Sequence, residues 1–538
     1  MRKLGLPILE SRFQNSNLKE RGFSYPRKSN SSGGLESPPS VSFESAQGSF
    51  EITSGDKMKN NRENLLKSLP QLGVLLEKTA VAGLRRKFGI GMAKLSLREI
   101  VAETREKILK GRISAVPSEK EIVSAAEKKI RRMISPDGRK AVNATGILLH
   151  TGLGRAPFCD EAVEQMRIFS GYSILQTDLG SGKRSLREEK TEKMLVELTG
   201  CEAATVVNNN AAATMLILNT LAEGREVIIS RGQLIEIGGE FRMPDVMEKS
   251  GAVIREIGTT NRTHLKDYEK AVNENTGAVI HVHTSNYRVR GFTGTPEVCE
   301  LRKLLDRHPG IPLIDDLGSG ALVSLSQFGL PDEPLVADSL AAGADVVCFS
   351  GDKLICGPQS GIICGKREII EGIRKNPFAR MFRTGKMTIA ALEATLVHFI
   401  NGTCRENIPL YKMLSTDMKT LNRRAEKLAV RFSGMKNIRA AAEKDFAYVG
   451  SGAIPDEGVP SAILRISQPG NDDFAENTSR KLRNNIPAVF CRINDNSLVF
   501  DMRTLMDDDY EYLEKHLLEI ITCSDNFSEQ KNFNKDRL

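Results

Sequence analysis

The chain has 538 residues, of which 40% are hydrophobic and 27% charged, and its mean hydropathy is −0.28. This length exceeds one ordinary domain, and the composition excludes a chain that is disordered throughout. No apolar run approaches the roughly 18–20 residues that a membrane-spanning helix needs. The nine cysteines include no Cys-x-x-Cys pair, which indicates free thiols in a reducing, cytoplasmic compartment. The seven histidines lack the spacing of a zinc hydrolase, and we expect no metal site.

Positive charge is concentrated near the N-terminus. Residues 1–140 contain 28 basic and 15 acidic residues, an excess of 13, whereas the remaining 398 residues contain 48 basic and 53 acidic ones. A solvated helical surface and a polyanion-binding module are both consistent with this distribution. Charge alone does not distinguish RNA, DNA and phosphorylated metabolites as partners.

The first 57 residues contain twelve serines and too few apolar residues to form a core. We expect either a disordered leader or a misassigned start, because Met58 opens a more protein-like sequence. Residues 58–140 predict a basic helical domain. Two Ser-x-x-Glu motifs, which begin at Ser96 and Ser118, match the capping box that starts a helix.

From residue 141 to 395, short β-branched runs alternate with longer helical stretches. This alternation predicts an α/β domain built on a mostly parallel sheet that helices cover on both faces. Residues 396–525 predict a smaller α+β domain with a helix near its end, and residues 526–538 form a polar tail.

Lys353 is the first candidate for chemistry, since it follows an apolar strand in the segment Ser350-Gly-Asp-Lys353. A lysine in a dry site can lose its proton and condense with an aldehyde cofactor. A lysine in an ordinary turn is the alternative. A penicillin-binding motif also begins Ser-x-x-Lys, but its companion tripeptides Ser-Asp-Asn and Lys-Thr-Gly do not occur here.

Two further segments place polar groups at strand ends. Asp316 ends a strand 37 residues before Lys353 and is suited to the ring nitrogen of pyridoxal phosphate. Asn208, Asn209 and Asn210 open a helix, where free amides suit a phosphate group. Helix caps are the alternative for both segments. Together with Ser350, whose hydroxyl suits the phosphate, the combination indicates pyridoxal 5'-phosphate on a fold-type-I scaffold.

Several arginines and two histidines lie outside this set. Surface ion pairs are the default interpretation of Arg155, Arg184, Arg187, Arg380 and Arg383, but the last two could bind one small anion together. The histidines at 281 and 283 alternate on a strand, and we interpret them as polar lining, not as metal ligands.

The sequence resembles the bacterial selenocysteine synthase family, the L-seryl-tRNA(Sec) selenium transferases, from about residue 62 to 520. The stretches that carry this resemblance are Asn143-Ala-Thr-Gly-Ile-Leu-Leu-His-Thr151, Val207-Asn-Asn-Asn-Ala-Ala-Ala213, Ser230-Arg-Gly-Gln-Leu-Ile-Glu-Ile-Gly-Gly239, Gly258-Thr-Thr-Asn-Arg-Thr263, Asp316-Leu-Gly-Ser-Gly320, Phe349-Ser-Gly-Asp-Lys353 and Lys386-Met-Thr-Ile-Ala-Ala-Leu-Glu-Ala394.

The resemblance implies a fold-type-I transferase in which Lys353 holds pyridoxal phosphate, Asp316 meets its ring nitrogen and Asp352 assists. It implies that Arg155, Arg380 and Arg383 bind selenophosphate and that the basic N-terminal domain docks the tRNA. The implied reaction converts L-seryl-tRNA(Sec) to L-selenocysteinyl-tRNA(Sec) by β-elimination and selenium addition through an aminoacrylyl-tRNA. The implied assembly is a homo-oligomeric ring of dimers, a decamer, with active sites at subunit interfaces.

The chain departs from the family pattern at Gly152, where asparagine is usual, and at Ser185 and Leu186 within a loop that usually contains another glycine. Two other functions remain open. One is a pyridoxal-phosphate-dependent lyase for a small phosphorylated amino acid or amino sugar, which would not need a basic N-terminal module. The other is a non-catalytic RNA-binding protein with a decayed enzyme core.

Overall fold

The computed structural model describes residues 62–134, 140–238, 241–285, 287, 289–450 and 452–535. The predicted leader, residues 1–57, lies outside the described residues. The chain divides into two compact units, residues 1–136 and 137–538. In the part of the chain that the structure describes, none of the helices combines the length and apolar character needed to cross a membrane.

The first unit is helical and contains α2 (Leu72–Glu77), α3 (Thr79–Leu109) and α4 (Glu119–Ile134). Its small core joins apolar residues of all three helices, among them Leu75, Leu97 and Ile130. The two predicted helix starts had different outcomes. The Ser118 motif caps α4 and is confirmed, whereas Ser96 lies inside α3 and is fully buried, so that prediction is wrong.

The second unit is built around a seven-stranded sheet with the order β2-β10-β9-β8-β7-β3-β6. These strands are β2 (Ala203–Val207), β3 (Glu226–Ser230), β6 (Val253–Ile257), β7 (Thr276–Val282), β8 (Leu313–Gly318), β9 (Val346–Ser350) and β10 (Gly361–Gly365). Only β10 runs antiparallel to its neighbours in this sheet, which confirms the predicted mostly parallel arrangement.

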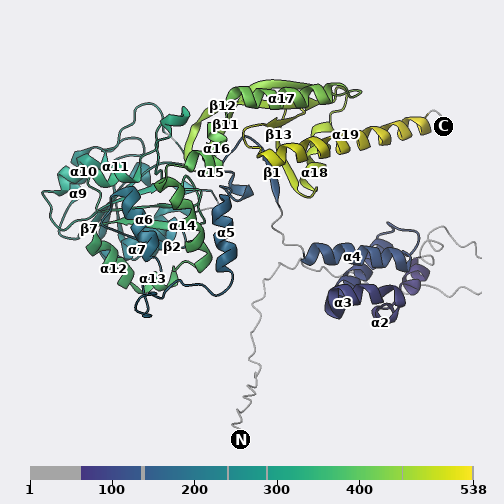
Figure 1. Ribbon diagram of the computed structural model, residues 1–538, viewed down its shortest axis with the longest axis horizontal. Coiled ribbons are helices and arrows are strands. Elements are labelled where there is room, and N and C mark those ends of the chain that lie inside the picture. The colour runs from purple at the N-terminus through teal and green to yellow at the C-terminus, as the bar shows by residue number, and fades with distance from the viewer. Residues whose placement is uncertain are drawn as a thin grey trace, which may run out of the picture. The chain divides into compact units, whose positions relative to one another are not determined.

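Helices cover both faces of this sheet: α7 packs in the core on one face, and α6 and α14 pack in the core on the other (Figure 1). The helices of this part are α5 (Asp160–Phe169), α6 (Glu189–Thr199), α7 (Asn210–Ala222), α8 (Met243–Lys249), α9 (Leu265–Ala271), α10 (Val298–Leu305), α11 (Val336–Ala341), α12 (Arg367–Lys375), α13 (Pro377–Met381) and α14 (Lys386–Ile400). Neighbouring residues of β9 alternate between the two cores: Cys348 packs with α7 residues, whereas Phe349 packs with α14 residues. Because both faces of the central strands are buried, these strands are mostly apolar, and the polar exceptions include His281 in β7 and Asp316 in β8.

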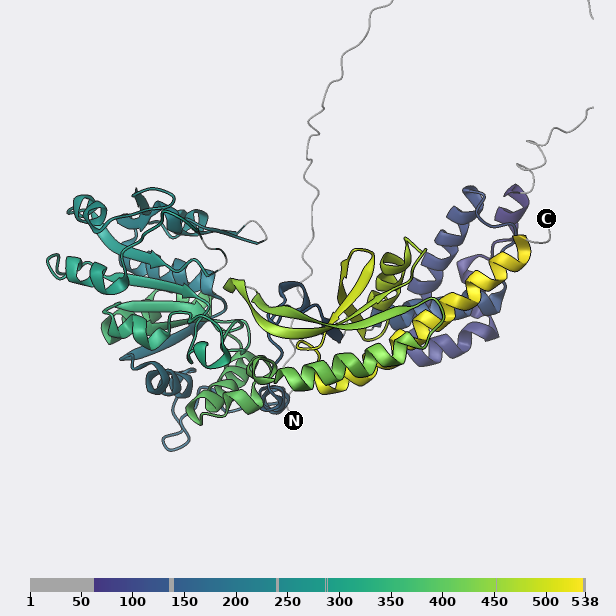
Figure 2. The same cartoon turned by 90° about the horizontal axis from the view of Figure 1, so that it is seen from above.

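A second, five-stranded sheet has the order β1-β13-β14-β12-β11. Its strands and the helices that pack on them are β1 (Ala141–Ala144), α17 (Met418–Ser433), β11 (Arg439–Gly450), β12 (Ala453–Ser467), α18 (Phe474–Arg483), β13 (Ala488–Asn494), β14 (Ser497–Asp501) and α19 (Asp507–Lys535). Two short helices that precede α17, namely α15 (Cys404–Asn407) and α16 (Pro409–Ser415), pack in the core of the large sheet instead. Figure 2 shows the long β11–β12 hairpin beside α17, which packs against both strands. The first strand comes from residues 141–144, far away in sequence from the other four.

Candidate active site

Lys353 lies in the turn after β9, at the edge where the parallel strands end. Its side chain is buried, with 8% of the residue exposed. The backbone packs closely around it, because a methyl group on Gly452 would lie 2.7 Å from Lys353 Nζ and one on Gly318 would lie 3.7 Å from it. Burial lowers the pKa of Lys353, and the nearby charge of Arg155 lowers it further. An amine in this setting releases its proton more easily than an exposed lysine does.

Asp352 and Arg155 form an ion pair next to this lysine. Arg155 Nη1 donates to Asp352 Oδ2 at 2.7 Å, and the two side chains are 30% and 16% exposed. The carboxylates of Asp316, Asp352 and Glu333 raise the pKa of Lys353, so they oppose the effects of burial and Arg155. The lysine therefore lies among charges of both signs.

Asp316 points from β8 toward the start of α7. It is 2% exposed, and its carboxylate accepts hydrogen bonds from Asn210 Nδ2 and from Thr214 Oγ1, both at 2.8 Å. The Gly318 amide donates to it at 3.1 Å. Burial raises the pKa of Asp316, and the bonds from Asn210 and Thr214 oppose that rise. Thr214 was missed in the sequence, although it lies one helical turn after Asn210.

The three asparagines occupy different positions at the start of α7. Asn209 is the helix cap, since its side chain accepts from the Ala212 amide at 2.8 Å, and Asn210 holds Asp316. The Asn208 amide donates to the Phe382 carbonyl at 2.9 Å. Ser350 is the last residue of β9 and pairs in register with Gly361. A methyl group at Gly361 would lie 2.1 Å from the Asn209 carbonyl oxygen, so glycine allows these segments to meet.

The predicted arginines lie on two sides of this edge. Arg155 belongs to the Lys353 side, whereas the backbone of Arg383 bridges to Val207, directly before Asn208. Arg187 Nη1 donates to the Thr384 carbonyl at 2.7 Å. Burial lowers the pKa of Arg187, and the positive charges of Arg383, Arg380 and Arg184 add to this effect, whereas Glu188 opposes it. The structure thus adds Arg187 to the predicted arginine cluster.

His281 in β7 and His283, one residue after the end of β7, line a polar cavity of about 270 Å³, which confirms the prediction of polar lining. His281 Nδ1 lies 2.8 Å from Asp315 Oδ1, which fixes the orientation of the imidazole. His283 Nδ1 lies 3.6 Å from Glu333 Oε2.

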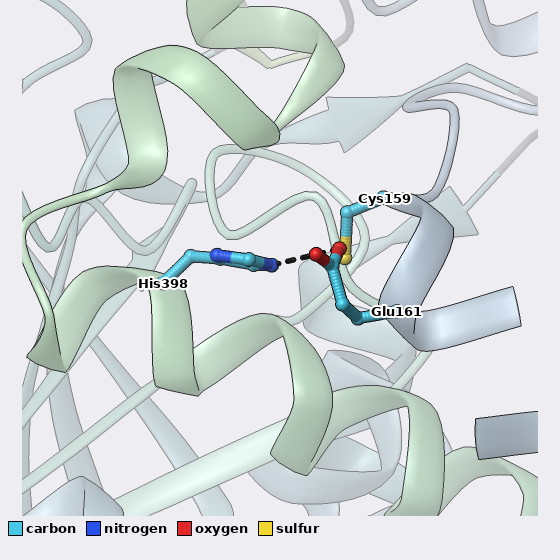
Figure 3. A group of neighbouring side chains, drawn as sticks. All are labelled: Cys159, Glu161 and His398. Carbon is cyan, nitrogen blue, oxygen red and sulfur yellow. Dashed lines mark hydrogen bonds and ion pairs between the residues drawn. The ribbon is translucent and has the colours of Figure 1, made fainter. Parts of the chain in front are cut away.

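A separate group of metal-ligating residue types lies between α5 and α14 (Figure 3). His398 Nε2 is 3.1 Å from Glu161 Oε2, and its Nδ1 is 3.1 Å from Thr403 Oγ1. Cys159 is buried immediately before α5, with its sulfur 4.0 Å from Thr395 Oγ1. Since both imidazole nitrogens have protein partners, we interpret the group as an ion pair that joins two helices.

Residues 141–506 match the family model described as SelA, L-seryl-tRNA selenium transferase. The chain is similar to the L-seryl-tRNA(Sec) selenium transferase of Carboxydothermus hydrogenoformans, with 42% identity over 85% of this chain and 98% of that protein. The enzyme of the same name from Aquifex aeolicus is 40% identical, over 86% of this chain and all of that protein. A solved D-glucosaminate-6-phosphate ammonia-lyase shares the fold, with a TM-score of 0.51 and 19% identity over 73% of this chain and 97% of that chain.

Proposed function

This chain belongs to the L-seryl-tRNA selenium transferase family, and on that premise we propose that it converts L-seryl-tRNA(Sec) to L-selenocysteinyl-tRNA(Sec) with selenophosphate as the selenium donor. The observation that carries the proposal is the buried amine of Lys353, with a pKa below its usual range, at the same sheet edge as the buried carboxyl of Asp316. Overall, the seryl hydroxyl leaves as water, selenium bonds to Cβ, and water cleaves the phosphorus–selenium bond of the donor, which releases inorganic phosphate.

The residues present fit pyridoxal 5'-phosphate, the cofactor of this enzyme. Lys353 offers an amine for the aldehyde, Asp316 offers a carboxyl for the ring nitrogen, and the start of α7 with Ser350 offers donors for the phosphate. Asn210 Oδ1 is buried without a hydrogen-bond partner, so this edge of the sheet still has a hydrogen-bond acceptor available to a bound group. When bound, the cofactor supplies an electron sink for the bond broken at the seryl Cα.

Lys353 acts as the base in this proposal. Its Nζ takes the proton from the seryl Cα and returns a proton to the departing β-hydroxyl oxygen. Asp316 holds the proton at the ring nitrogen, and Asn210 and Thr214 keep its carboxylate oriented. Asp352 sets the charge around Nζ together with Arg155.

The arginines act on the selenium donor. Arg380 lies in the last turn of α13, and Arg383 lies in the segment that connects α13 to α14. Both are exposed, and Arg187 lies beside this segment. Guanidinium groups suit the oxygens of a phosphate because they donate in a planar, two-pronged geometry. We assign these arginines and Arg155 to the binding of selenophosphate.

The helical unit supplies the binding surface for the tRNA in this proposal. Residues 58–140 contain 20 basic and 9 acidic residues, and exposed arginines and lysines project from α3 and α4. A polyanionic substrate explains such an excess, whereas a small-molecule lyase does not need it. We further propose that the protein is cytoplasmic and assembles as a ring of dimers, a decamer in total. The proposed domain boundaries lie near residues 58, 141, 396 and 526.

The proposal is tested by incubating the full chain with seryl-tRNA(Sec) and selenophosphate and identifying the amino acid released from the tRNA. Selenocysteine should form with the wild type and with Lys366→Ala, which changes a surface lysine, but not with Lys353→Ala. Ordinary seryl-tRNA serves as the control substrate. Recovery of unchanged serine by a protein that binds pyridoxal phosphate would contradict the transferase, and turnover of a small phosphorylated amino compound would then favour the lyase. A protein that binds tRNA but takes up no pyridoxal phosphate would favour the non-catalytic RNA-binding alternative.

A further inference from the structure

Two thiols lie together at the end of the large sheet that is remote from Lys353. Cys201 stands between the end of α6 and the start of β2, and Cys364 lies in β10, where it pairs in register with Ala204. Both thiols are free and belong to the same apolar cluster. They are within hydrogen-bonding reach of each other and of the Thr199 hydroxyl. The fold thus brings together two cysteines that are 163 positions apart in the sequence.

Only one of the two thiols can be reached from outside. Cys201 lines a cavity of about 660 Å³ at the edge of the sheet opposite to Lys353, together with Arg302 and Lys366. Cys201 is 5% exposed, whereas Cys364 is completely buried behind it. A small molecule in the cavity would therefore meet the sulfur of Cys201 first. Arg302 and Lys366 are both ion-paired to Asp345, and Glu202, Asp306 and Glu368 also line the cavity. The cavity therefore presents charges of both signs, which suits a reagent that carries both ammonium and carboxylate groups.

The two thiols differ in acidity because each affects the other. The Cys364 thiol donates to the Cys201 sulfur, which lowers the pKa of Cys201 to about 7 despite its burial. The same interaction, together with complete burial, raises the pKa of Cys364 well above its usual value. A reactive thiolate next to a protonated partner is the arrangement that thiol–disulfide exchange requires.

We propose that Cys201 and Cys364 form a site of reversible thiol modification, in which Cys201 attacks small disulfides and Cys364 completes an internal disulfide bond. In the first step, the Cys201 thiolate attacks one sulfur of oxidised glutathione, forms a mixed disulfide and releases one glutathione thiolate. In the second step, Cys364 loses its proton to that thiolate and attacks the Cys201 sulfur, which releases the second glutathione. The oxidised glutathione is reduced to two thiols, and the two cysteines are oxidised to one disulfide.

The experiment treats the reduced, cofactor-loaded full chain with oxidised glutathione and maps its disulfides by mass spectrometry without reduction. The wild type should yield a peptide pair joined through Cys201 and Cys364, and dithiothreitol should reverse the link. Cys364→Ser should retain one glutathione on Cys201, because no second thiol displaces it. In Cys201→Ser, the buried Cys364 should stay unmodified. Below the pKa of Cys201, the rate should fall about tenfold per pH unit.

Cys299→Ser is the matched control, since Cys299 is a partly exposed thiol outside this cluster. It should form the Cys201–Cys364 link at the wild-type rate. The pyridoxal phosphate content and the circular dichroism of each variant establish that it is folded, and alanine replacements substitute for any serine variant that is not. The proposal is overturned if glutathione attaches only at Cys299, or if Cys364 reacts equally fast with and without Cys201.

Discussion

Lys353 has neighbours of both charge signs, and their opposing effects can be separated by substitution. Arg155 lowers the pKa of this lysine, whereas Asp352, which is ion-paired to Arg155, raises it. An amine must lose its proton before it can attack an aldehyde. The pH dependence of cofactor uptake should therefore report the charge around Nζ.

We predict that Arg155→Gln and Asp352→Asn shift this pH dependence in opposite directions. Without the arginine, the pKa of Lys353 rises, so pyridoxal phosphate uptake by the cofactor-free protein needs a higher pH. Without the carboxylate, the pKa falls, so uptake proceeds at a lower pH. The rate of uptake is followed by the visible absorbance of the bound cofactor between pH 6 and pH 10. Shifts in the same direction would contradict this charge balance.

Gly452 approaches the same lysine from the small-domain side. Its φ is +77°, and a methyl group there would lie 2.7 Å from Nζ. Gly470 has the same φ but open space around it. The two glycines therefore differ in their contact with Lys353 and not in backbone conformation.

We predict that Gly470→Ala costs roughly 1–2 kcal/mol of unfolding free energy, because a side chain disfavours the left-handed conformation. Gly452→Ala should cost more and also reduce the cofactor that borohydride attaches to the protein, because its methyl group displaces Nζ. Denaturant unfolding and the mass of the borohydride-treated protein measure the two effects. Equal trapping in both variants would show that Gly452 does not constrain the lysine.

At the scale of the element, the two Ser-x-x-Glu motifs show what local sequence can decide. Ser118 and Glu121 exchange hydrogen bonds at the start of α4, with Ser118 N donating to Glu121 Oε2 at 2.7 Å. Ser96 instead lies within α3, where its hydroxyl donates to the Ala93 carbonyl at 3.1 Å. Gly89 has a non-helical backbone that divides α3 into two helical segments, and the second segment begins before Ser96.

We predict that Ser118→Ala weakens the first turn of α4 by about 1 kcal/mol, the usual value of a lost cap. Ser96→Ala should leave the backbone of α3 unchanged, because alanine favours a helix interior. Amide hydrogen exchange in the full chain should show faster exchange at residues 119–122 in the first variant only. Faster exchange in α3 of the Ser96→Ala variant would instead indicate that the Ser96 side chain does cap a helix.

At the scale of the whole molecule, the basic excess of the helical unit can be tested for its role in binding the tRNA. Arg98, Arg105 and Lys107 are exposed on α3, in the unit with the basic excess. Contacts between such residues and phosphates release counterions, so binding weakens as salt rises.

We predict that replacing these three residues with glutamine weakens binding of the selenocysteine tRNA and lowers the steepness of its salt dependence by up to about 3, near 1 per lost phosphate contact. The control replaces Lys266, Lys270 and Lys303, which are exposed on the second unit. Filter binding across a range of salt concentrations gives both slopes. Equal slopes in the two triple variants would place the tRNA away from α3.

The sequence alone was sufficient to predict the mostly parallel sheet and the capping box at Ser118, and to single out Lys353 and Asp316 as a candidate pair. Each of these depends on local periodicity or on a short motif, so the information lies within a few neighbouring residues. The tertiary structure alone decided that residues 141–144 join the second sheet, that Thr214 holds Asp316, that Arg187 joins the other arginines and that Cys201 meets Cys364. These contacts connect segments far apart in the chain, and they depend on strand order and register, which a local pattern does not encode.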